Sequence, residues 1–421
     1  MGQISATACT DCHNECLATA PVPRESFEGT NDEWEVQNFI KTHRAPDGGE
    51  DGWKTWNFNV FKLPVEALMP LSQALLSALS IPTKFSIPSM KLRRLLIGVR
   101  ELMLRNNVMY HNYYHALDVM QAAFVFVESF RASAYLDDLE IAAFLLAALC
   151  HDLDHPGLNN DYHIKKGLPL AIRYNDSSVL ENHHAAKMFQ LLEDVRMSIL
   201  ENVEPWQKKR FREICTGAIL ATDMSVHFTL LEQFKTCLAN GSSEEEARFA
   251  RLEREDPFSE RRESKGGSLP EFNAFLSANE RAFLINVLLH TVDICNPCRQ
   301  WPVAQHWNDL IQEEFFLQGD LEKSEGLVVS PNMDRERTNV INSALGFIDF
   351  IITPLFAAVT EAMPRVKVCL MNLEDNRKKL NAIRIERSSE TKSPDDKKWD
   401  KRERDFEGLI SASFKIRTTI S

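Results

Sequence analysis

Apolar residues recur every three or four positions almost without a break over residues 63–363. Leu92, Leu95, Leu96 and Val99 illustrate the spacing, which places apolar side chains on one face of a helix. No run alternates between apolar and polar residues over the length of a strand. The pattern therefore predicts an all-α chain, folded as one large multi-helix domain rather than as several small ones.

Two segments outside this pattern set the expected limits of the domain. Residues 1–52 contain prolines, glycines and many charges with little periodicity, so we expect a mostly irregular leader before an ordered domain at 53–366. Residues 240–268 are charged, poor in apolar residues and bounded by Gly and Ser. This composition predicts a solvated insertion within the domain.

The last part of the chain, residues 367–421, is expected to be a charged and partly disordered tail. Disorder is predicted for residues 387–405, where charged residues dominate. Residues 406–410, Phe-Glu-Gly-Leu-Ile, are apolar enough to dock on the rest of the protein.

Composition argues against some classes of protein. The formal net charge of −12 argues against a general nucleic-acid binder, although it is compatible with a small phosphate-bearing ligand. Nine cysteines, an odd number scattered over 421 residues, do not form the pattern of a disulfide framework. The N-terminus lacks a secretory signal, and no run approaches the roughly 18 apolar residues of a membrane span. We therefore expect a soluble protein of the reducing cytoplasm.

The extreme N-terminus suggests an anchor on the cytoplasmic face of a membrane. Gly2 opens a segment similar to an N-myristoylation signal, although Ala6 stands where Ser or Thr is usual. Cys9, Cys12 and Cys16 follow and are candidates for palmitoylation, which would supply the second lipid of a stable anchor. The alternative is a flexible tail with no lipid. Cys9-Thr-Asp-Cys12-His also matches a haem-attachment motif, but without an export signal we do not predict haem.

Two pairs of histidines, each spaced by four residues, are candidate metal ligands. His111 and His115 form the first pair, and His151 and His155 form the second, with Asp152 directly after His151. Side chains at positions i and i+4 lie on the same face of a helix. Asp152 follows an apolar helical run, where an unpaired carboxylate is costly to bury. Imidazole and carboxylate ligands in this setting indicate one or two divalent metal ions.

Asp293 is a further acid within an apolar helical segment, Leu288–Cys295. Taken alone, it could equally be a helix cap or a member of an ion pair. Together with the histidines and Asp152, it completes the H…HD…D signature of the HD-type metal phosphohydrolases.

Further motifs follow in a defined order: Tyr110–Gln121, His151–Gly157, Tyr174–His184, Ala221–Ser225, Glu313–Asp320 and Gly346–Asp349. Through these stretches, residues 53–366 resemble the catalytic domain of the class I 3′,5′-cyclic nucleotide phosphodiesterases, and the residues in several motifs are most similar to those of the cAMP-specific animal subfamily. The resemblance implies an all-α fold and hydrolysis of a cyclic nucleotide to the 5′-nucleotide.

The resemblance also implies a two-metal centre. His115, His151, Asp152 and Asp293 would bind a zinc ion, and Asp152 would reach a second ion, usually Mg²⁺ (or Mn²⁺), held mainly through waters. This division agrees with ligand chemistry, because imidazole suits zinc while carboxylate and water suit magnesium. A water between the ions would become the hydroxide that attacks phosphorus.

The resemblance assigns roles to other polar residues around the phosphate. His111 corresponds to the general acid that protonates the leaving 3′ oxygen, and Glu314 to the carboxylate that orients it. His155 would contact the phosphate or the attacking water. A last set would support metal-bound waters, or alternatively serve only in packing and hydrogen bonding: Glu181, His184 and Asp223.

The nucleotide base is expected in an apolar slot. Phe347 corresponds to the phenylalanine that stacks on the base, with Ile311 on the opposite wall and Phe315 nearby. The other pocket positions implied by the resemblance are Tyr110, Met224, Asn296, Asn308 and Ala344.

Ala344 departs from the family's pattern. The family has a glutamine three residues before the stacking phenylalanine, and its amide can both donate and accept a hydrogen bond at the purine edge. Loss of that pairing is expected to cost about 1–3 kcal/mol of binding. Three explanations stay open: weak affinity, compensation by Asn308, Asn342 or water, and a different substrate.

The sequence thus predicts a metal-dependent cyclic nucleotide phosphodiesterase, with cAMP weakly favoured over cGMP, that ends cyclic nucleotide signalling. One alternative is an HD-type hydrolase of another phosphoester. A second is a degenerate nucleotide-binding scaffold. The intact metal ligands and His111 argue against the scaffold, because decay would be expected to affect these residues as well as the base pocket.

Overall fold

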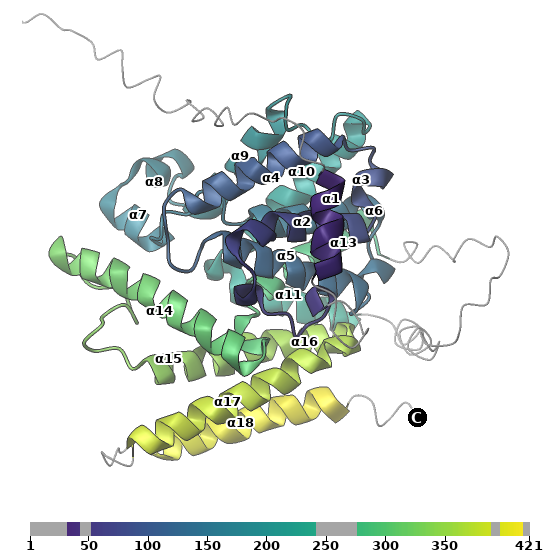
Figure 1. The fold of residues 1–421 in the computed structure, drawn as a ribbon. Coiled ribbons are helices and arrows are strands. Elements are labelled where there is room, and N and C mark those ends of the chain that lie inside the picture. The colour runs from purple at the N-terminus through teal and green to yellow at the C-terminus, as the bar shows by residue number, and fades with distance from the viewer. Residues whose placement is uncertain (1–31, 43–51, 241–275, 389–395, 416–421) are drawn as a thin grey trace, which may run out of the picture.

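The computed structural model describes residues 32–42, 52–240, 276–388 and 396–415, and its regular elements are helices (Figure 1). No β-strand occurs in these ranges, which confirms the all-α prediction. A π-helical turn, η8 (Ile348–Ile352), joins two of the α-helices. In chain order the α-helices are α1 (Asp32–Thr42), α2 (Val65–Ala78), α3 (Ile81–Lys84), α4 (Ser89–Leu104), α5 (Tyr113–Glu128), α6 (Asp138–Cys150), α7 (Asn160–Lys166), α8 (Pro169–Tyr174), α9 (Val179–Glu193), α10 (Pro205–Leu220), α11 (His227–Asn240), α13 (Ala278–Asp293), α14 (Trp301–Ser324), α15 (Val340–Phe347), α16 (Thr353–Ala362), α17 (Lys367–Ser388) and α18 (Asp396–Lys415).

The centre of the fold is formed by α5 and α6. Every residue from Leu139 to Cys150 in α6 is buried, and all but one of these is apolar. A helix that is apolar on all sides is stable in water only when other helices surround it. α5, α10 and α13 pack directly against α6 and provide this cover (Figure 1).

The polar exception in α6, Glu140, fixes the start of the helix. Its side chain accepts from the backbone of Asp137, and Asp137 in turn caps the first turn. Glu140 is fully buried and forms ion pairs with Arg210 of α10 and Arg281 of α13, the latter at 2.9 Å. These contacts tie three helices together at one end, and the other end of α6 carries His151.

The loop between α14 and α15 packs very closely against α14. A Cβ atom at Gly319 would lie only 1.8 Å from the carbonyl oxygen of Met333, so a larger residue does not fit there. Three residues along the helix, the buried Glu322 accepts from the backbone nitrogen of Ser330 at 2.6 Å and from its hydroxyl at 2.7 Å. The loop is therefore held at two points.

The predicted tail is helical where the structure describes it. α17 and α18 run side by side, and α18 also packs on α16 (Figure 1). Residues 396–405, predicted to be disordered, form the first half of α18, while residues 389–395 lie outside the described ranges. The prediction was wrong because it ignored long-range contacts: Phe406 and Ile410 are 4% and 5% exposed, so residues 406–410 do dock as expected.

The described part of the leader is also helical rather than irregular. Phe39 of α1 is 3% exposed and packs on Trp53, with ring centroids 6.1 Å apart. The candidate lipid-bearing residues Gly2, Cys9, Cys12 and Cys16 lie outside the described residues. So do residues 241–268 of the expected insertion, which follow the end of α11.

Two observations concern apolar helices long enough to span a membrane and the state of the cysteines. Val340–Ala362 is long and apolar enough to cross a membrane, and 56% of its most apolar window is buried inside the fold, as in a core helix. Pro205–Leu220 and Met224–Ala239 pass the same test only as a pair bent by 80°. All six cysteines in the described ranges are free, in line with the expected absence of a disulfide framework.

Candidate active site

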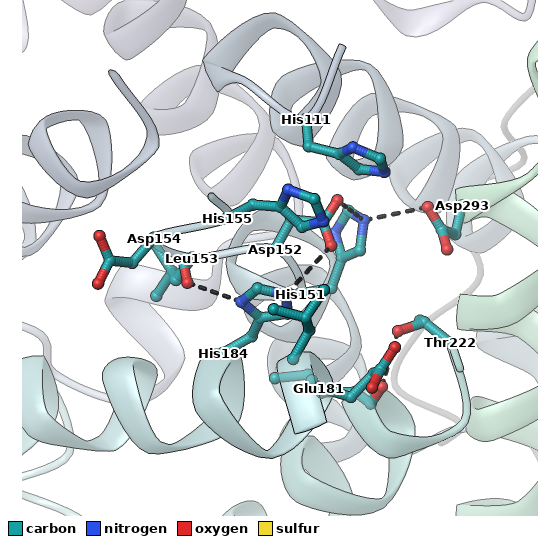
Figure 2. Close-up of polar contacts among 12 residues, drawn as sticks. His111, His151, Asp152, Leu153, Asp154, His155, Glu181, His184, Thr222 and Asp293 are labelled. Carbon is teal, nitrogen blue, oxygen red and sulfur yellow. Dashed lines mark hydrogen bonds and ion pairs between the residues drawn. The ribbon is translucent and has the colours of Figure 1, made fainter. Parts of the chain in front are cut away.

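Four predicted metal ligands meet where the ends of three helices converge. His115 lies in the first turn of α5, His151 and Asp152 directly follow the last residue of α6, and Asp293 is the last residue of α13. Their ligand atoms all lie within 4.8 Å of one another. Figure 2 shows the Asp293 side chain turned toward His151 and Asp152.

The distances between these atoms suit a small divalent cation. His151 Nε2 lies 3.0 Å from Asp293 Oδ1, 3.0 Å from Asp152 Oδ2 and 3.3 Å from His115 Nε2. Ligand atoms around a tetrahedral zinc ion at about 2.0–2.1 Å are separated by roughly 3.3 Å. His151 Nδ1 lies 2.9 Å from the carbonyl of Ala148, so Nδ1 carries the proton and Nε2 keeps its lone pair for a metal. The residues present therefore fit a metal ion.

A second cluster, His111, His155 and Glu314, lies beside the first. Glu314 of α14 contacts His111 Nδ1 at 2.5 Å and accepts from the backbone nitrogens of Tyr110 at 2.7 Å and His111 at 3.2 Å. Because the carboxylate binds both the imidazole and its backbone, it fixes the position of the ring. The free nitrogen of His111, Nε2, remains available for a ligand.

Electrostatics keep His111 protonated. Burial alone lowers the pKa of the His111 imidazole, but the Glu314 carboxylate, helped by Asp152 and Asp293, outweighs it and raises the pKa to about 9. Burial conversely raises the pKa of Glu314, while the charge of His111 outweighs it and lowers this pKa to about 2. At neutral pH the pair is therefore an imidazolium and a carboxylate, and His111 can serve as a general acid.

His155 stacks on His111 with ring centroids 3.9 Å apart, and His184 stacks behind it at 5.5 Å (Figure 2). Burial and the charge of His111 lower the pKa of His155 well below its usual range. Burial likewise lowers the pKa of His184 to about 4, although Asp152 opposes it. Both rings are therefore neutral at pH 7 and can accept as well as donate hydrogen bonds.

The remaining acids lie on the α9 side of the same cavity. Burial, and then the nearby Asp223, raise the pKa of Glu181 to about 7. Asn160 Nδ2 donates to Glu181 Oε2 at 2.9 Å, and Ser178 donates to Asp223 at 2.8 Å. Two carboxyl groups beside a ligand set can hold metal-bound waters.

Most of these groups line one cavity of 510 Å³, a size common for small-molecule sites. The fully buried His115 and His151 lie behind Asp152 and Asp293 and are not part of its lining. Apolar side chains of α14 and α15 also line the cavity. The structure thus brings together metal ligands, a proton donor and an apolar slot. Among the predicted pocket residues, those that line the cavity are Tyr110, Met224, Asn296, Asn308, Ile311, Phe315 and Phe347.

Residues 110–373 match the family described as 3′5′-cyclic nucleotide phosphodiesterase. The chain belongs to this family. The matched region holds every residue of the two clusters, so the family assignment and the geometry concern the same part of the molecule.

Individual phosphodiesterases show the extent of the likeness. The chain is 35% identical over 343 residues to the 3′,5′-cyclic-nucleotide phosphodiesterase regA of Dictyostelium discoideum, covering 82% of this chain and 39% of that protein. It is 33% identical over 373 residues to the 3′,5′-cyclic-AMP phosphodiesterase 4C of Rattus norvegicus, covering 87% and 62%. It therefore spans only 39% and 62% of the length of these two relatives.

A solved phosphodiesterase domain has the same architecture. The structure of the phosphodiesterase domain of the RhoPDE fusion protein from the choanoflagellate Salpingoeca rosetta superposes with a TM-score of 0.68 at 29% identity. The match covers 82% of this chain and 98% of that chain. Most of the described helices therefore belong to the phosphodiesterase fold.

Asn296, which lines the cavity, is held by one side-chain hydrogen bond. Its Nδ2 donates to the Tyr110 hydroxyl at 2.5 Å, while its Oδ1 is buried without a hydrogen-bond partner. Ala344, predicted as a pocket residue, is not among the residues that line the cavity. Its side chain ends at Cβ and so does not reach the cavity from α15, where a glutamine would extend further.

Three residues with clear positions in the phosphodiesterase site were missed by sequence reasoning. Asn160 holds Glu181, as described above, and its Oδ1 also accepts from the backbone nitrogen of Leu180 at 2.9 Å. Trp307 and Met333 line the cavity. Trp307 occurs one helical turn before Ile311, a spacing that could have indicated a shared face; nothing in the sequence marks Met333.

Proposed function

We propose that this chain hydrolyses 3′,5′-cyclic nucleotides to 5′-nucleotides with the help of divalent metal ions. One observation carries the proposal: Asp152 and Asp293 of the four-residue ligand set line the same cavity as the His111–Glu314 pair. A site of this kind can bind a phosphodiester at the metals and protonate a leaving oxygen beside them.

The metal ions fit residues that the chain already provides. Zinc would be held by His115, His151, Asp152 and Asp293. Asp152 would also bind a second ion, Mg²⁺ or Mn²⁺, whose other ligands would be mainly waters. The cavity residues that could hold these waters are Glu181, His184 and Asp223. When bound, such ions lower the pKa of a water to near neutrality and neutralise charge on a phosphoryl group.

The protein's own groups handle the proton. His111 is charged at neutral pH because of Glu314, so it can donate to the 3′ oxygen as the phosphorus–oxygen bond breaks. Glu314 keeps the imidazole in place before and after this transfer. Neutral His155, stacked on His111, can hydrogen-bond a phosphoryl oxygen. The apolar slot between Phe347 and Ile311 would take the base.

The base end supports a preference for cAMP over cGMP. Asn296 Oδ1 is a buried acceptor that makes no hydrogen bond to the protein, and it belongs to a residue that lines the cavity. The amino group of adenine is a donor, whereas guanine presents a carbonyl oxygen at the corresponding position. An adenine amino group placed against Asn296 would supply the donor that Oδ1 lacks, and a guanine there would leave two acceptors facing each other.

The first test is direct turnover. The purified chain, supplied with Zn²⁺ and Mg²⁺, is incubated with cAMP or cGMP, and the 5′-monophosphate is quantified. We expect faster turnover of cAMP, and a His111→Gln variant that retains metal but loses at least about 100-fold in kcat, as is common for a lost general acid. No product from either nucleotide would exclude the proposal.

A second candidate function, hydrolysis of another phosphoester, is favoured by Ala344, which leaves the purine edge without the family's glutamine. A panel of phosphomonoesters and phosphodiesters, assayed beside cAMP, separates the two functions. Ala344→Gln should lower the KM for one cyclic nucleotide by about tenfold if the missing amide limits base binding. A lower KM for a non-nucleotide ester than for cAMP would favour the second function.

A further inference from the structure

The wall that would hold the base is connected to the C-terminal helix through one buried carboxylate. Asp349 lies in η8, two residues after Phe347, and is 9% exposed. It accepts a hydrogen bond from Arg377 Nε of α17 at 2.6 Å and from Arg402 Nε of α18 at 2.9 Å. Two guanidinium groups from two different helices thus hold the turn that follows Phe347.

Arg377 extends this contact into α18. It is 1% exposed, donates to Glu403 of α18 at 2.6 Å, and lies over the ring of Phe406 at 4.3 Å. With α18 docked, the two arginines balance the charges of Asp349 and Glu403. Removal of α18 would leave Asp349 with one of its two arginine partners.

Phe347 borders a second cavity. This cavity, of 920 Å³, is also lined by Gly346 and by Arg402 of α18. Phe347 lines the 510 Å³ cavity as well, together with Asp152 and Asp293. Phe347 therefore borders two cavities and is only partly buried against the core. Its position depends on the ends of its helix, one of which is anchored by Asp349.

The backbone at this anchor is of a kind that can adjust. η8 is π-helical, and short π-helical turns are uncommon and occur frequently at functional sites. Kinks in helices occur at turns of this type, and this one is held by ion pairs to α17 and α18. The guanidinium of Arg402 also lies over the ring of Phe350 at 5.1 Å, so Arg402 of α18 contacts two residues of η8, Asp349 and Phe350.

We propose that α18 is a positioning element that sets the affinity of the site for the base. By holding Asp349 through Arg402, docked α18 keeps Phe347 at the distance from Ile311 that a base requires. This inference rests on the proposed function. α18 lies beyond residues 110–373, which match the phosphodiesterase family, so the C-terminal segment of this chain would add control that the matched region does not supply.

The test compares two arginines on the same helix in the full chain. Arg402→Gln removes one guanidinium from Asp349, and Arg404→Gln removes the same charge at an exposed position. We expect Arg402→Gln to raise the KM for cAMP by about 2- to 10-fold, the range for one weakened aromatic contact. kcat should stay within about twofold of the parent value, because the metals and His111 are untouched. Arg404→Gln should match the parent in both.

Amide hydrogen exchange of the nucleotide-free protein supplies a readout independent of activity. Residues 340–352 should exchange faster in Arg402→Gln than in Arg404→Gln, and Arg402→Lys should restore part of the protection. An unchanged KM despite faster exchange would overturn the proposal, as would equal effects of both substitutions. If the parent protein hydrolyses no cyclic nucleotide, the proposed function fails, and the exchange data alone then decide whether α18 positions η8.

Discussion

At the scale of single residues, Glu314 is the neighbouring group with the largest influence on the charge of His111, the proposed proton donor. Burial lowers the pKa of His111, whereas the Glu314 carboxylate, with Asp152 and Asp293, raises it to about 9. Activity that depends on protonated His111 should therefore persist through neutral pH and fall as pH rises through about 9.

Replacement of Glu314 by Gln tests this assignment. The amide keeps the shape but removes the negative charge, so the pKa of His111 should fall and the alkaline limb of kcat should move to lower pH. At pH 7.5 we expect a loss of about 10²- to 10⁴-fold, the usual contribution of a general acid. The measurement is a full pH–rate profile, with Glu313→Gln on the exposed side of the same helix turn as the control. An unshifted limb would remove Glu314 from this role.

Asp154 has an unusual backbone conformation in the turn that links Asp152 to His155. It adopts a left-handed conformation (φ = 65°) between Asp152 and His155, and its carboxylate contacts His183 at 3.2 Å, Lys187 at 3.1 Å and Arg105 at 3.3 Å. Asp and Asn adopt the left-handed backbone conformation at a lower energetic cost than other residues that have a Cβ atom. Lys187, Arg105 and His183 therefore stabilise the turn between Asp152 and His155.

Asp154→Ala should accordingly weaken metal binding. Loss of the anchoring contacts leaves the turn free to relax, and the affinity for Zn²⁺ should fall by about 10- to 100-fold, as is typical when partners behind metal ligands are removed. Titration calorimetry measures this without turnover. Asp154→Asn, which keeps the left-handed preference and a hydrogen-bonding side chain, should lose less. Equal affinities for parent and Asp154→Ala would contradict the argument.

At the scale of elements, a fully buried ion pair connects α5 to the segment between α13 and α14. Arg299 and Asp118 are both 0% exposed and lie 2.9 Å apart. Arg299 also donates to Gln121 at 2.9 Å and to the carbonyl of Trp56 at 3.1 Å. This arginine therefore joins three segments that are distant in sequence, close to the helix ends that carry His115 and Asp293.

Removal of one partner of this pair should be costly. Arg299→Met leaves Asp118 buried without its cation, and the free energy of unfolding should fall by about 3–5 kcal/mol. Urea unfolding provides the measurement. The double variant Arg299→Met/Asp118→Leu should regain much of the loss, whereas Lys84→Met in the half-exposed Lys84–Asp138 pair should cost under about 1 kcal/mol. Similar costs at both sites would refute the argument.

The helices, and the cluster of candidate metal ligands, could be predicted because their signals are local. His115, His151 and Asp152 stand in dense motifs, and apolar periodicity marks most of the helices between them. α18 could not be predicted, because the first half of its sequence is charged. Its stability depends on ion pairs with Asp349 of η8 and Arg377 of α17, which are distant in sequence. Asp154 was missed for a similar reason, since its partners lie on α9 and beyond the end of α4.

At the scale of the whole molecule, one candidate metal site joins the ends of α5, α6 and α13. A ligand that binds only the folded chain raises its stability with concentration, by about 2.7 kcal/mol at one hundred times its Kd. Metal should therefore stabilise the entire domain and not only the site.

The thermal midpoint of the chelator-treated protein should accordingly rise on addition of Zn²⁺, by several degrees at saturation. Differential scanning calorimetry measures the shift. Asp293→Ala, which removes one ligand from α13, should abolish most of it, while Asp309→Ala on the surface-facing part of α14 should not. A metal-independent midpoint in the parent protein would show that these four residues do not bind the ion.

The contact between Gly319 and the carbonyl of Met333 restricts which variants of this sequence can persist. No side chain fits within 1.8 Å of an oxygen atom, so any other residue at position 319 displaces the loop that carries Met333 along the cavity wall. Selection should consequently remove substitutions of Gly319, even though Gly319 is not among the proposed metal-binding, catalytic or base-binding residues. Among natural variants that remain active, a change here is expected only together with a remodelled loop.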